Sequence, residues 1–176
     1  MDIRPEIRAD AGAIDALHRL AFADASRGYE GEDETRMVGD LRAGPNYLPE
    51  LSLVAVEGGA VVGHVVFTQV DFVPDDGARP EVKVLSLAPL GVLPRVQGQG
   101  IGTRLVDTGI RRASVRPEPL VVVLGAPAYY RRFHFAPAVD AGIRCPFPCA
   151  QDEYQVRRLP GFRPFGAPGT IRYPSA

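Results

Sequence analysis

The first half of the chain switches between helical and strand periodicity. Residues 3–8 suit a first strand, and the apolar positions after Asp10 recur every three or four residues, which predicts an amphipathic helix capped by that aspartate. The apolar-face positions are Ile14, Leu17, His18, Ala21 and Phe22. An acidic stretch over 24–33 leads to a second predicted helix over 34–42, which ends before Gly44-Pro45.

The middle of the chain is rich in β-forming residues. Residues 51–57 and 60–70 are joined at Gly58-Gly59, a pair that favours a hairpin because glycine adopts positive φ freely. After a loop over 74–80, a third apolar run covers 82–92. These three segments predict a meander of three strands.

Helices and strands alternate in the second half. We expect a helix from about 101 to 114, a buried strand over 120–124, a short helix over 127–133 and a final strand near 170–173. The inward positions expected of the first of these helices are Ile101, Leu105, Ile110 and Ala113. This alternation indicates the α/β class, with a mixed sheet flanked by helices.

Composition restricts the classes of protein that fit. The chain has 176 residues, 45% hydrophobic and 23% charged, which suits a single domain over 1–176. A net charge of −1 and a pI near 6.3 argue against a nucleic-acid partner. No run has the apolar length of a membrane span, and the first residues lack a signal peptide's apolar core, so we expect a cytoplasmic protein. Its cations are almost all arginine, as in high-G+C bacterial genomes.

The two cysteines carry no metal signature. Cys145 and Cys149 flank Pro146-Phe147-Pro148, and no histidine lies at ligand spacing. We expect two reduced thiols and no metal. A disulfide is the weaker interpretation because the expected compartment is reducing.

The most informative segment is a glycine-rich turn between a strand and a helix. Gly98, Gly100 and Gly102 stand between the run over 82–92 and the helix that follows. Glycines let a diphosphate approach the backbone, and the first amides of the helix supply donors. The turn therefore predicts a phosphate-binding loop, with a plain helix-capping turn as the alternative.

Two familiar phosphate loops do not fit. A Walker loop requires Gly-Lys-Ser or Gly-Lys-Thr, but the chain's one lysine, Lys83, lies elsewhere. A dinucleotide loop requires G-x-G-x-x-G after the first strand, whereas this turn follows several elements. An NAD-dependent reductase is therefore disfavoured.

The pattern that fits is R-x-x-G-x-G, at Arg95, Gly98 and Gly100. With the strand before it, this stretch resembles the coenzyme A loop of the GNAT superfamily of acyl-CoA N-acyltransferases, and the order of elements matches that family over residues 3–138. The resemblance implies a mixed, mostly antiparallel sheet with one splayed strand pair. It also implies acetyl-CoA as cosubstrate, held at Leu90, Gly91, Val92, Arg95, Gln97, Gly98, Gln99, Gly100, Ile101, Gly102 and Thr103.

A second match lies at Tyr129–Phe135, which is similar to the family's Y-x-x-x-G-F segment. The resemblance makes Tyr130 the candidate acid that protonates the leaving thiolate; packing of the short helix is the alternative. His134 stands where the family commonly has glycine, so the turn must adopt another φ/ψ solution or an adapted form. Arg131 and Arg132 are within reach of the coenzyme's phosphates by this resemblance, but a solvated face is favoured.

The general base stays open in the sequence. Candidates are Glu30, Glu32, Asp33, Glu34, Glu81 and His64. A structural role is favoured for Glu34, which opens a helix, and for His64 and His18, which lie among apolar neighbours.

The expected partner is an amine, either a small molecule or an exposed protein amine. The segment between the first two helices walls the acceptor site in the family, and here it holds four carboxylates and no cation from Gly28 to Thr35. This favours a cationic amine, with a solvated acidic loop as the alternative. A homodimer is one option. The function expected is direct acetyl transfer to that amine, and a noncatalytic acyl-CoA-binding or sensing module is the alternative.

Overall fold

The computed structural model describes residues 1–174, which group into two compact units. The first unit contains Met1–Phe67 and Ala88–Arg112, and the second contains Thr68–Leu87 and the chain from Ala113 onward. Strands β3 and β4 each run from one unit into the other. The expected single domain over 1–176 stays a prediction.

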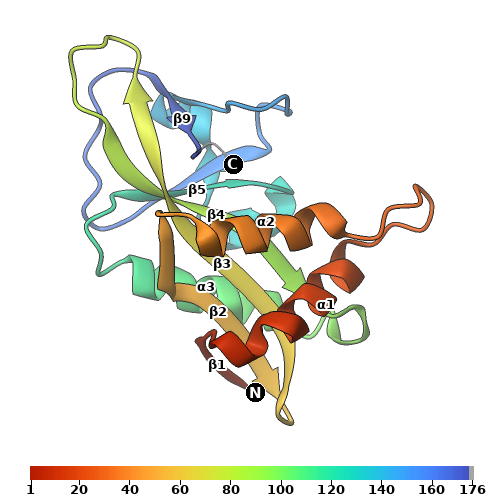
Figure 1. Cartoon of the computed structure of the whole chain (residues 1–176). Helices are drawn as coiled ribbons and strands as arrows, with labels where there is room; N and C mark the ends of the chain where they lie inside the picture. The colour runs from red at the N-terminus through yellow and green to blue at the C-terminus, as the bar shows by residue number, and fades with distance from the viewer. Residues whose placement is uncertain (175–176) are drawn as a thin grey trace. The chain divides into compact units, whose positions relative to one another are not determined.

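The first unit is a sheet with the strand order β1-β2-β3-β4. Its strands are β1 (Asp2–Pro5), β2 (Tyr47–Glu57), β3 (Ala60–Pro74) and the last part of β4 (Val82–Val92). β1 and β2 are antiparallel, with Asp2 opposite Val56, and β2 and β3 form the predicted hairpin (Figure 1).

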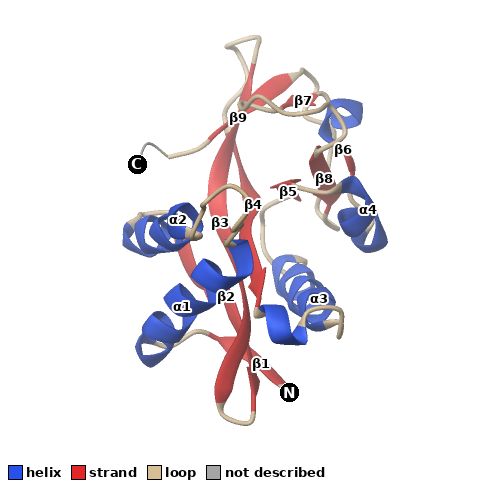
Figure 2. Cartoon of the chain, turned by 90° about the vertical axis from the view of Figure 1, so that its right-hand side faces the viewer, coloured by secondary structure: helices blue, strands red, loops and turns tan. Residues whose placement is uncertain are grey.

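Three helices cover this sheet. They are α1 (Ala11–Phe22), α2 (Glu32–Ala43) and α3 (Ile101–Ala113). α1 and α2 lie on one face and α3 on the other (Figure 2). Successive side chains of a strand point to opposite faces, so His64 of β3 meets α1, whereas Gly63 and Phe67 meet α3.

The predicted cap of α1 is wrong. The side chain of Asp10 makes no capping bond to α1. Its carboxylate instead accepts hydrogen bonds from the amide of Ile7 at 2.8 Å and from the guanidinium of Arg4 at 2.6 and 2.9 Å. Asp10 therefore fastens β1 to the short 3-10 turn that precedes the helix.

The second unit continues the sheet in the order β4-β5-β8-β6, and β9 pairs with β3 and β7. Its further strands are β5 (Leu120–Leu124), β6 (Ala136–Pro137), β7 (Ile143–Arg144), β8 (Tyr154–Arg158) and β9 (Gly169–Arg172), and its short helix is α4 (Pro127–Tyr130). A buried cluster that includes Phe72, Tyr154 and Val156 forms its core.

The expected α/β fold with a mostly antiparallel mixed sheet is confirmed. The pairs β1–β2, β3–β9, β5–β8 and β6–β8 are antiparallel. β4 pairs with β5 in parallel, and within the described chain this register holds only Leu85 with Val121 and Ser86 with Val122. Only two residues of β4 therefore pair with β5, as expected for the splayed strand pair.

Candidate functional site

The segment after β4 is anchored to the sheet of the first unit. The amide of Leu93 donates to the carbonyl of Val62 on β3 at 3.0 Å. Pro94–Val96 then form a 3-10 turn, and the side-chain amide of Gln97 donates back to the carbonyl of Val92 at 3.0 Å. These bonds fix where the glycine-rich turn begins.

Two of the three glycines have the backbone that only glycine adopts easily. Gly98 has φ of 76° and Gly100 has φ of 79°, both in the left-handed region. A Cβ added to either would meet no heavy atom of the protein within 4 Å. Gly102 differs, because it already lies within α3 and has no positive φ. The turn is therefore open above Gly98 and Gly100.

The turn presents a row of amides without protein acceptors. The amide of Arg104 donates to the carbonyl of Gly100 at 3.0 Å. Within residues 1–174, none of the backbone amides from Gly98 to Thr103 donates a hydrogen bond to a protein atom. These are the free donors at a helix start, where the helix dipole is positive, and exposed Arg95 and Arg104 add charge beside them. Such a turn suits a phosphate.

The other predicted binding residues differ in exposure. Gly91 and Ile101 are buried, Leu90, Val92, Gly102 and Thr103 are half-buried, and Arg95, Gln97, Gly98, Gln99 and Gly100 are exposed. The residues of β4 and α3 would therefore act through their backbone, and the residues between these elements lie open to solvent.

Gly91 is the point where α1 packs against β4. A Cβ at this position would lie 2.8 Å from Cδ2 of Leu17 and 2.9 Å from Nδ1 of His18. A larger residue fits here only if the side chains of Leu17 and His18 shift. The imidazole of His18 is therefore held directly against the strand end that the family resemblance assigns to the cosubstrate.

A buried polar cluster surrounds this histidine, and the sequence did not reveal it as a unit. The carboxylate of Glu6 accepts from Nε of Arg42 at 2.7 Å, the hydroxyl of Tyr47 at 2.6 Å and Nε2 of His64 at 3.0 Å. Nδ1 of His64 lies 2.9 Å from Nε2 of His18. The cluster thus joins the residue that follows β1 to α1, α2, β2 and β3.

Hydrogen bonding sets the charges in this cluster. Burial alone would raise the pKa of Glu6, but the bonds from His64, Arg42 and Tyr47 outweigh it and hold that pKa far below its usual range. Burial lowers the pKa of His64, against the attraction of Glu6. Burial, helped by His64 and Arg42, lowers the pKa of His18 to about 3. Glu6 is therefore ionised and both histidines are neutral near neutral pH.

The neutral histidines predict acid sensitivity. A buried histidine whose pKa is lowered from 6.5 to about 3 binds fewer protons when folded, so its contribution to stability is lost as pH falls below 6.5. Between pH 6.5 and 4.5, His18 alone should reduce the free energy of unfolding by about 1 kcal/mol per pH unit. Urea titrations followed by circular dichroism measure this.

A midpoint that does not change between pH 6.5 and 4.5 would contradict the neutral assignment.

Tyr130 lies in the second unit, where its ring packs in an aromatic group. Ring centroids lie 5.1 Å from Tyr129, 6.4 Å from Phe133 and 5.6 Å from Phe135. The side chain is buried, and its hydroxyl makes no hydrogen bond to another described residue. Burial raises its pKa, so the phenol keeps its proton.

The structure shows how the chain accommodates His134 at the position where the family commonly has glycine. It adopts φ of 60° and ψ of 30° and is the one residue other than glycine with positive φ in the described chain. Histidine is among the residues that tolerate this region. The turn therefore keeps the left-handed geometry, and the spacing to Tyr130 is preserved.

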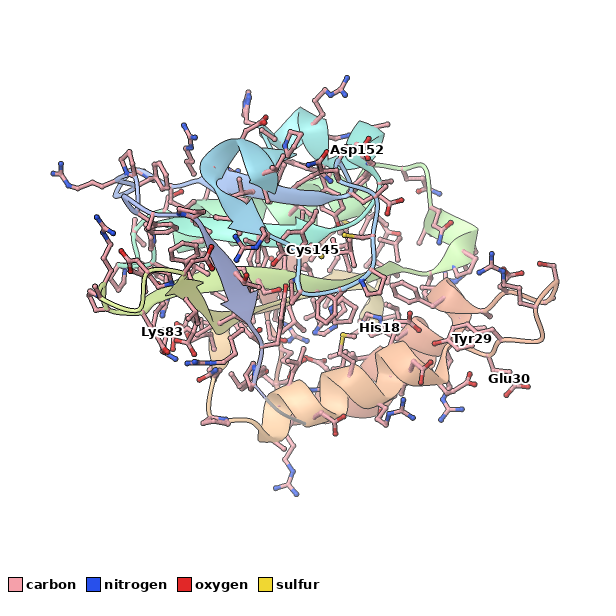
Figure 3. The ribbon with its side chains drawn as sticks, turned by 90° about the horizontal axis from the view of Figure 1, so that it is seen from above. His18, Tyr29, Glu30, Lys83, Cys145 and Asp152 are labelled. Atoms are coloured by element: carbon pink, nitrogen blue, oxygen red, sulfur yellow. The ribbon has the colours of Figure 1, made fainter. Side chains whose placement is uncertain are left out.

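The acidic candidates for the base are divided between paired and free groups. The hydroxyl of Tyr29 donates to Glu34 at 2.5 Å. Asp33 pairs with Arg36, just beyond the cation-free stretch. Glu81 pairs with Arg172 in the second unit. Glu30 and Glu32 have exposed side chains, and Glu30 lies at the outer edge of the loop between α1 and α2 (Figure 3).

Other predicted features have structural explanations. Arg131 and Arg132 are exposed, and Arg132 donates to the carbonyl of Tyr129 at 3.0 Å and lies over its ring, as expected of a solvated face. Cys145 and Cys149 are free thiols. The described residues contain no cluster suited to a metal ion and no helix long and apolar enough to cross a membrane.

Comparison with known proteins decides the family. Residues 14–135 match the model of the acetyltransferase (GNAT) family. The chain belongs to this family.

Relatives support the assignment along the whole chain. The N-acetyltransferase YhbS of Escherichia coli K12, described as uncharacterized, is 36% identical over 174 residues, which covers 98% of this chain and 96% of YhbS. The crystal structure of E. coli YhbS in complex with CoA has a TM-score of 0.83 at 34% identity and covers 98% of this chain and 88% of that one. A GNAT acetyltransferase from Brucella melitensis in complex with acetyl-CoA has a TM-score of 0.73 at 31% identity, covering 99% and 96%.

Proposed function

We propose that this GNAT protein transfers an acetyl group from acetyl-CoA to a primary amine, directly and without a covalent enzyme intermediate. The observation that carries the proposal is the row of free amides from Gly98 to Thr103 at the start of α3. These donors suit the diphosphate of a coenzyme. The CoA and acetyl-CoA complexes of the relatives support the same cosubstrate.

The chemistry assigns further roles on β4 and α4. A backbone N–H of Leu90–Val92 would polarise the thioester carbonyl, which makes its carbon open to attack by the amine. Tyr130 would donate its proton to the departing thiolate, and its raised pKa keeps that proton available at neutral pH. The amine nitrogen forms a bond to the carbonyl carbon, and the C–S bond breaks. The nitrogen gives up one proton to solvent, and solvent returns a proton to the Tyr130 phenolate.

The acceptor proposed is a cationic amine gathered by the loop between α1 and α2. Glu30 lies on this loop and Glu32 opens α2 directly after it; both residues are exposed, and Glu32 accepts from the amide of Glu30 at 3.1 Å. Their negative charge would raise the local concentration of a protonated amine, an effect that salt weakens. A cytoplasmic location and a homodimer stay predictions.

Changing Glu30 and Glu32 to glutamine should reduce kcat/KM for a cationic acceptor by roughly two- to tenfold, since each exposed charge contributes little. Thiol release would be measured with polyamines, aminoglycosides, amino acids and lysine peptides at low and moderate ionic strength. The matched control neutralises Glu57 and Asp107, which are exposed outside this loop.

The loop's role is contradicted if the preferred acceptor is neutral or anionic, or if both double variants behave alike. A noncatalytic acyl-CoA-binding module is the competing function. It predicts acetyl-CoA binding with no thiol release from any acceptor in the panel.

A further inference from the structure

The buried cluster of the first unit ends in an unpaired atom. Within residues 1–174, two buried side-chain nitrogens lack a hydrogen-bond partner, Nδ1 of His18 and Nε of Arg157. An unsatisfied buried polar atom costs roughly 1–3 kcal/mol. The side chain of His18 has no exposed surface, so no bulk solvent offsets this cost. Such an atom calls for an explanation.

The neighbouring groups decide what this nitrogen can do. Nε2 of His64 lies 3.0 Å from the carboxylate of Glu6 and 3.0 Å from the hydroxyl oxygen of Ser52. An ionised carboxylate can only accept a hydrogen bond, so Nε2 of His64 must carry the proton. The Ser52 hydroxyl then accepts from the same N–H. Nδ1 of His64 is then bare and accepts from Nε2–H of His18. A neutral imidazole has one N–H, so Nδ1 of His18 is a bare lone pair.

This lone pair faces β4 at Gly91. A Cβ on Gly91 would lie 2.9 Å from Nδ1 and 3.0 Å from Cε1 of the same ring. Gly91 is the central residue of Leu90–Val92, where we placed the thioester carbonyl. Nδ1 is therefore an unpaired acceptor atom beside the strand end proposed for the acetyl group.

The loop proposed to gather the amine lies against the same turn of α1. A Cβ on Gly31, the residue before α2, would lie 2.7 Å from the carbonyl oxygen of Arg19 and 2.9 Å from that of His18. The last residue of the acidic loop thus rests on the backbone of His18. Figure 3 shows His18 between α1 and the strands, with Tyr29 and Glu30 on this loop.

We propose that Nδ1 of His18 accepts a hydrogen bond from the N–H of the acceptor amine and so aims the nitrogen's lone pair at the thioester carbonyl. This inference rests on the proposed acetyl transfer. A neutral amine has N–H groups to donate and one lone pair for attack, so the bond orients the nucleophile without consuming its lone pair. Glu6 and His64 act as positioning residues because they fix the tautomer of His18.

The enclosed imidazole requires a neighbouring side chain to move before an amine can reach it. Phe22 is half-buried, one turn further along α1, and its ring stacks on His18 with centroids 5.8 Å apart. Displacement of this ring would uncover the face of the imidazole on which it stacks.

Two substitutions separate the two nitrogens of His18. His18→Gln places an amide near Nε2, so it can keep the bond to His64, but it leaves no acceptor at Nδ1. His18→Asn places an oxygen near Nδ1 and loses the bond to His64. We expect kcat/KM for the amine to fall about ten- to a hundredfold in His18→Gln and clearly less in His18→Asn, with acetyl-CoA affinity unchanged in both.

A purely structural role predicts the opposite order. His18→Gln would then behave like the wild type in turnover, and His18→Asn would lose both thermal stability and activity. Either that order or equal activity of the two variants would overturn the inference. If the inference fails in this way but the wild-type protein still releases thiol in the presence of an amine, the proposed acetyl transfer is not contradicted.

A measurement on the wild type covers the case in which neither variant folds. In imidazole-¹⁵N-labelled protein, we expect His18 Nδ1 to have the resonance of an unprotonated nitrogen, and to shift when an amine acceptor is added to the CoA complex. No shift, or a shift with CoA alone that the amine does not change, would overturn the inference. A shift without thiol release from any amine would instead contradict the proposed acetyl transfer.

Discussion

Replacing Gly100 with valine is expected to weaken acetyl-CoA binding by roughly ten- to a thousandfold while the fold persists. The loss combines strain at a φ of 79°, which β-branched residues avoid, with the loss of charge-assisted bonds worth roughly 1.5–3 kcal/mol each. A Cβ at this position meets no protein atom within 4 Å, so the added side chain projects into the open space where the diphosphate is proposed to bind. Calorimetric titration measures the affinity.

Gly77→Val is the matched control for backbone strain. Gly77 also has positive φ, at 61°, is exposed, and has open space around its Cα, but it lies in the loop between β3 and β4. This control should bind acetyl-CoA as the wild type does. If a folded Gly100→Val protein also keeps the wild-type affinity, the glycine-rich turn is not the coenzyme site.

Replacing Tyr130 with phenylalanine is expected to lower turnover by about ten- to a thousandfold, the range typical of a general acid, with little change in coenzyme affinity. The change removes only the hydroxyl, which bonds to no other described residue, so the aromatic packing with Phe133 and Phe135 should survive. Thiol release in the steady state gives kcat, and single-turnover rates establish that chemistry limits it.

Tyr129→Phe provides the control, because the neighbouring ring is half-buried on the same short helix. It should keep most of the turnover. Equal rates for Tyr130→Phe and the wild type, with chemistry limiting, would remove Tyr130 from the mechanism.

Much of the fold could be predicted because its central strands are continuous apolar runs. β4 and β5 have the predicted bounds, and the predicted inward residues of α3 are buried. β2 begins at Tyr47, before the predicted start, and β3 continues to Pro74, beyond the predicted end. The added part of β3, Asp71–Pro74, pairs with β9, a partner far away in the sequence.

The strands after residue 135 were harder to predict. β6 and β7 hold two residues each, and β8 ends in two arginines, so neither length nor alternation distinguishes them from loops. β8 exists because β5 offers it an antiparallel partner, and that partner lies far away in the sequence. Tertiary pairing rather than local propensity decides such strands.

In the candidate site, too, the features formed by neighbouring residues could be predicted and those formed by distant residues could not. The glycine turn is contiguous, so its spacing alone indicated a phosphate loop. The contact between His18 and His64 joins residues 46 positions apart, and Glu6 completes the cluster from the segment that follows β1. No local pattern marks such a group, and each histidine viewed alone suits a buried structural role. Only the fold shows that one of their nitrogens lacks a partner.

The most direct test of acetyl transfer is a single-turnover reaction with isotopically labelled acetyl-CoA, excess protein and an amine acceptor, analysed by mass spectrometry of both protein and acceptor. Direct transfer predicts that the labelled acetyl group appears in an amide of the acceptor, with one equivalent of free CoA and no label on the protein. Labelled acetyl-CoA that stays bound and intact with every acceptor, or label that accumulates on the protein first, would contradict direct acetyl transfer.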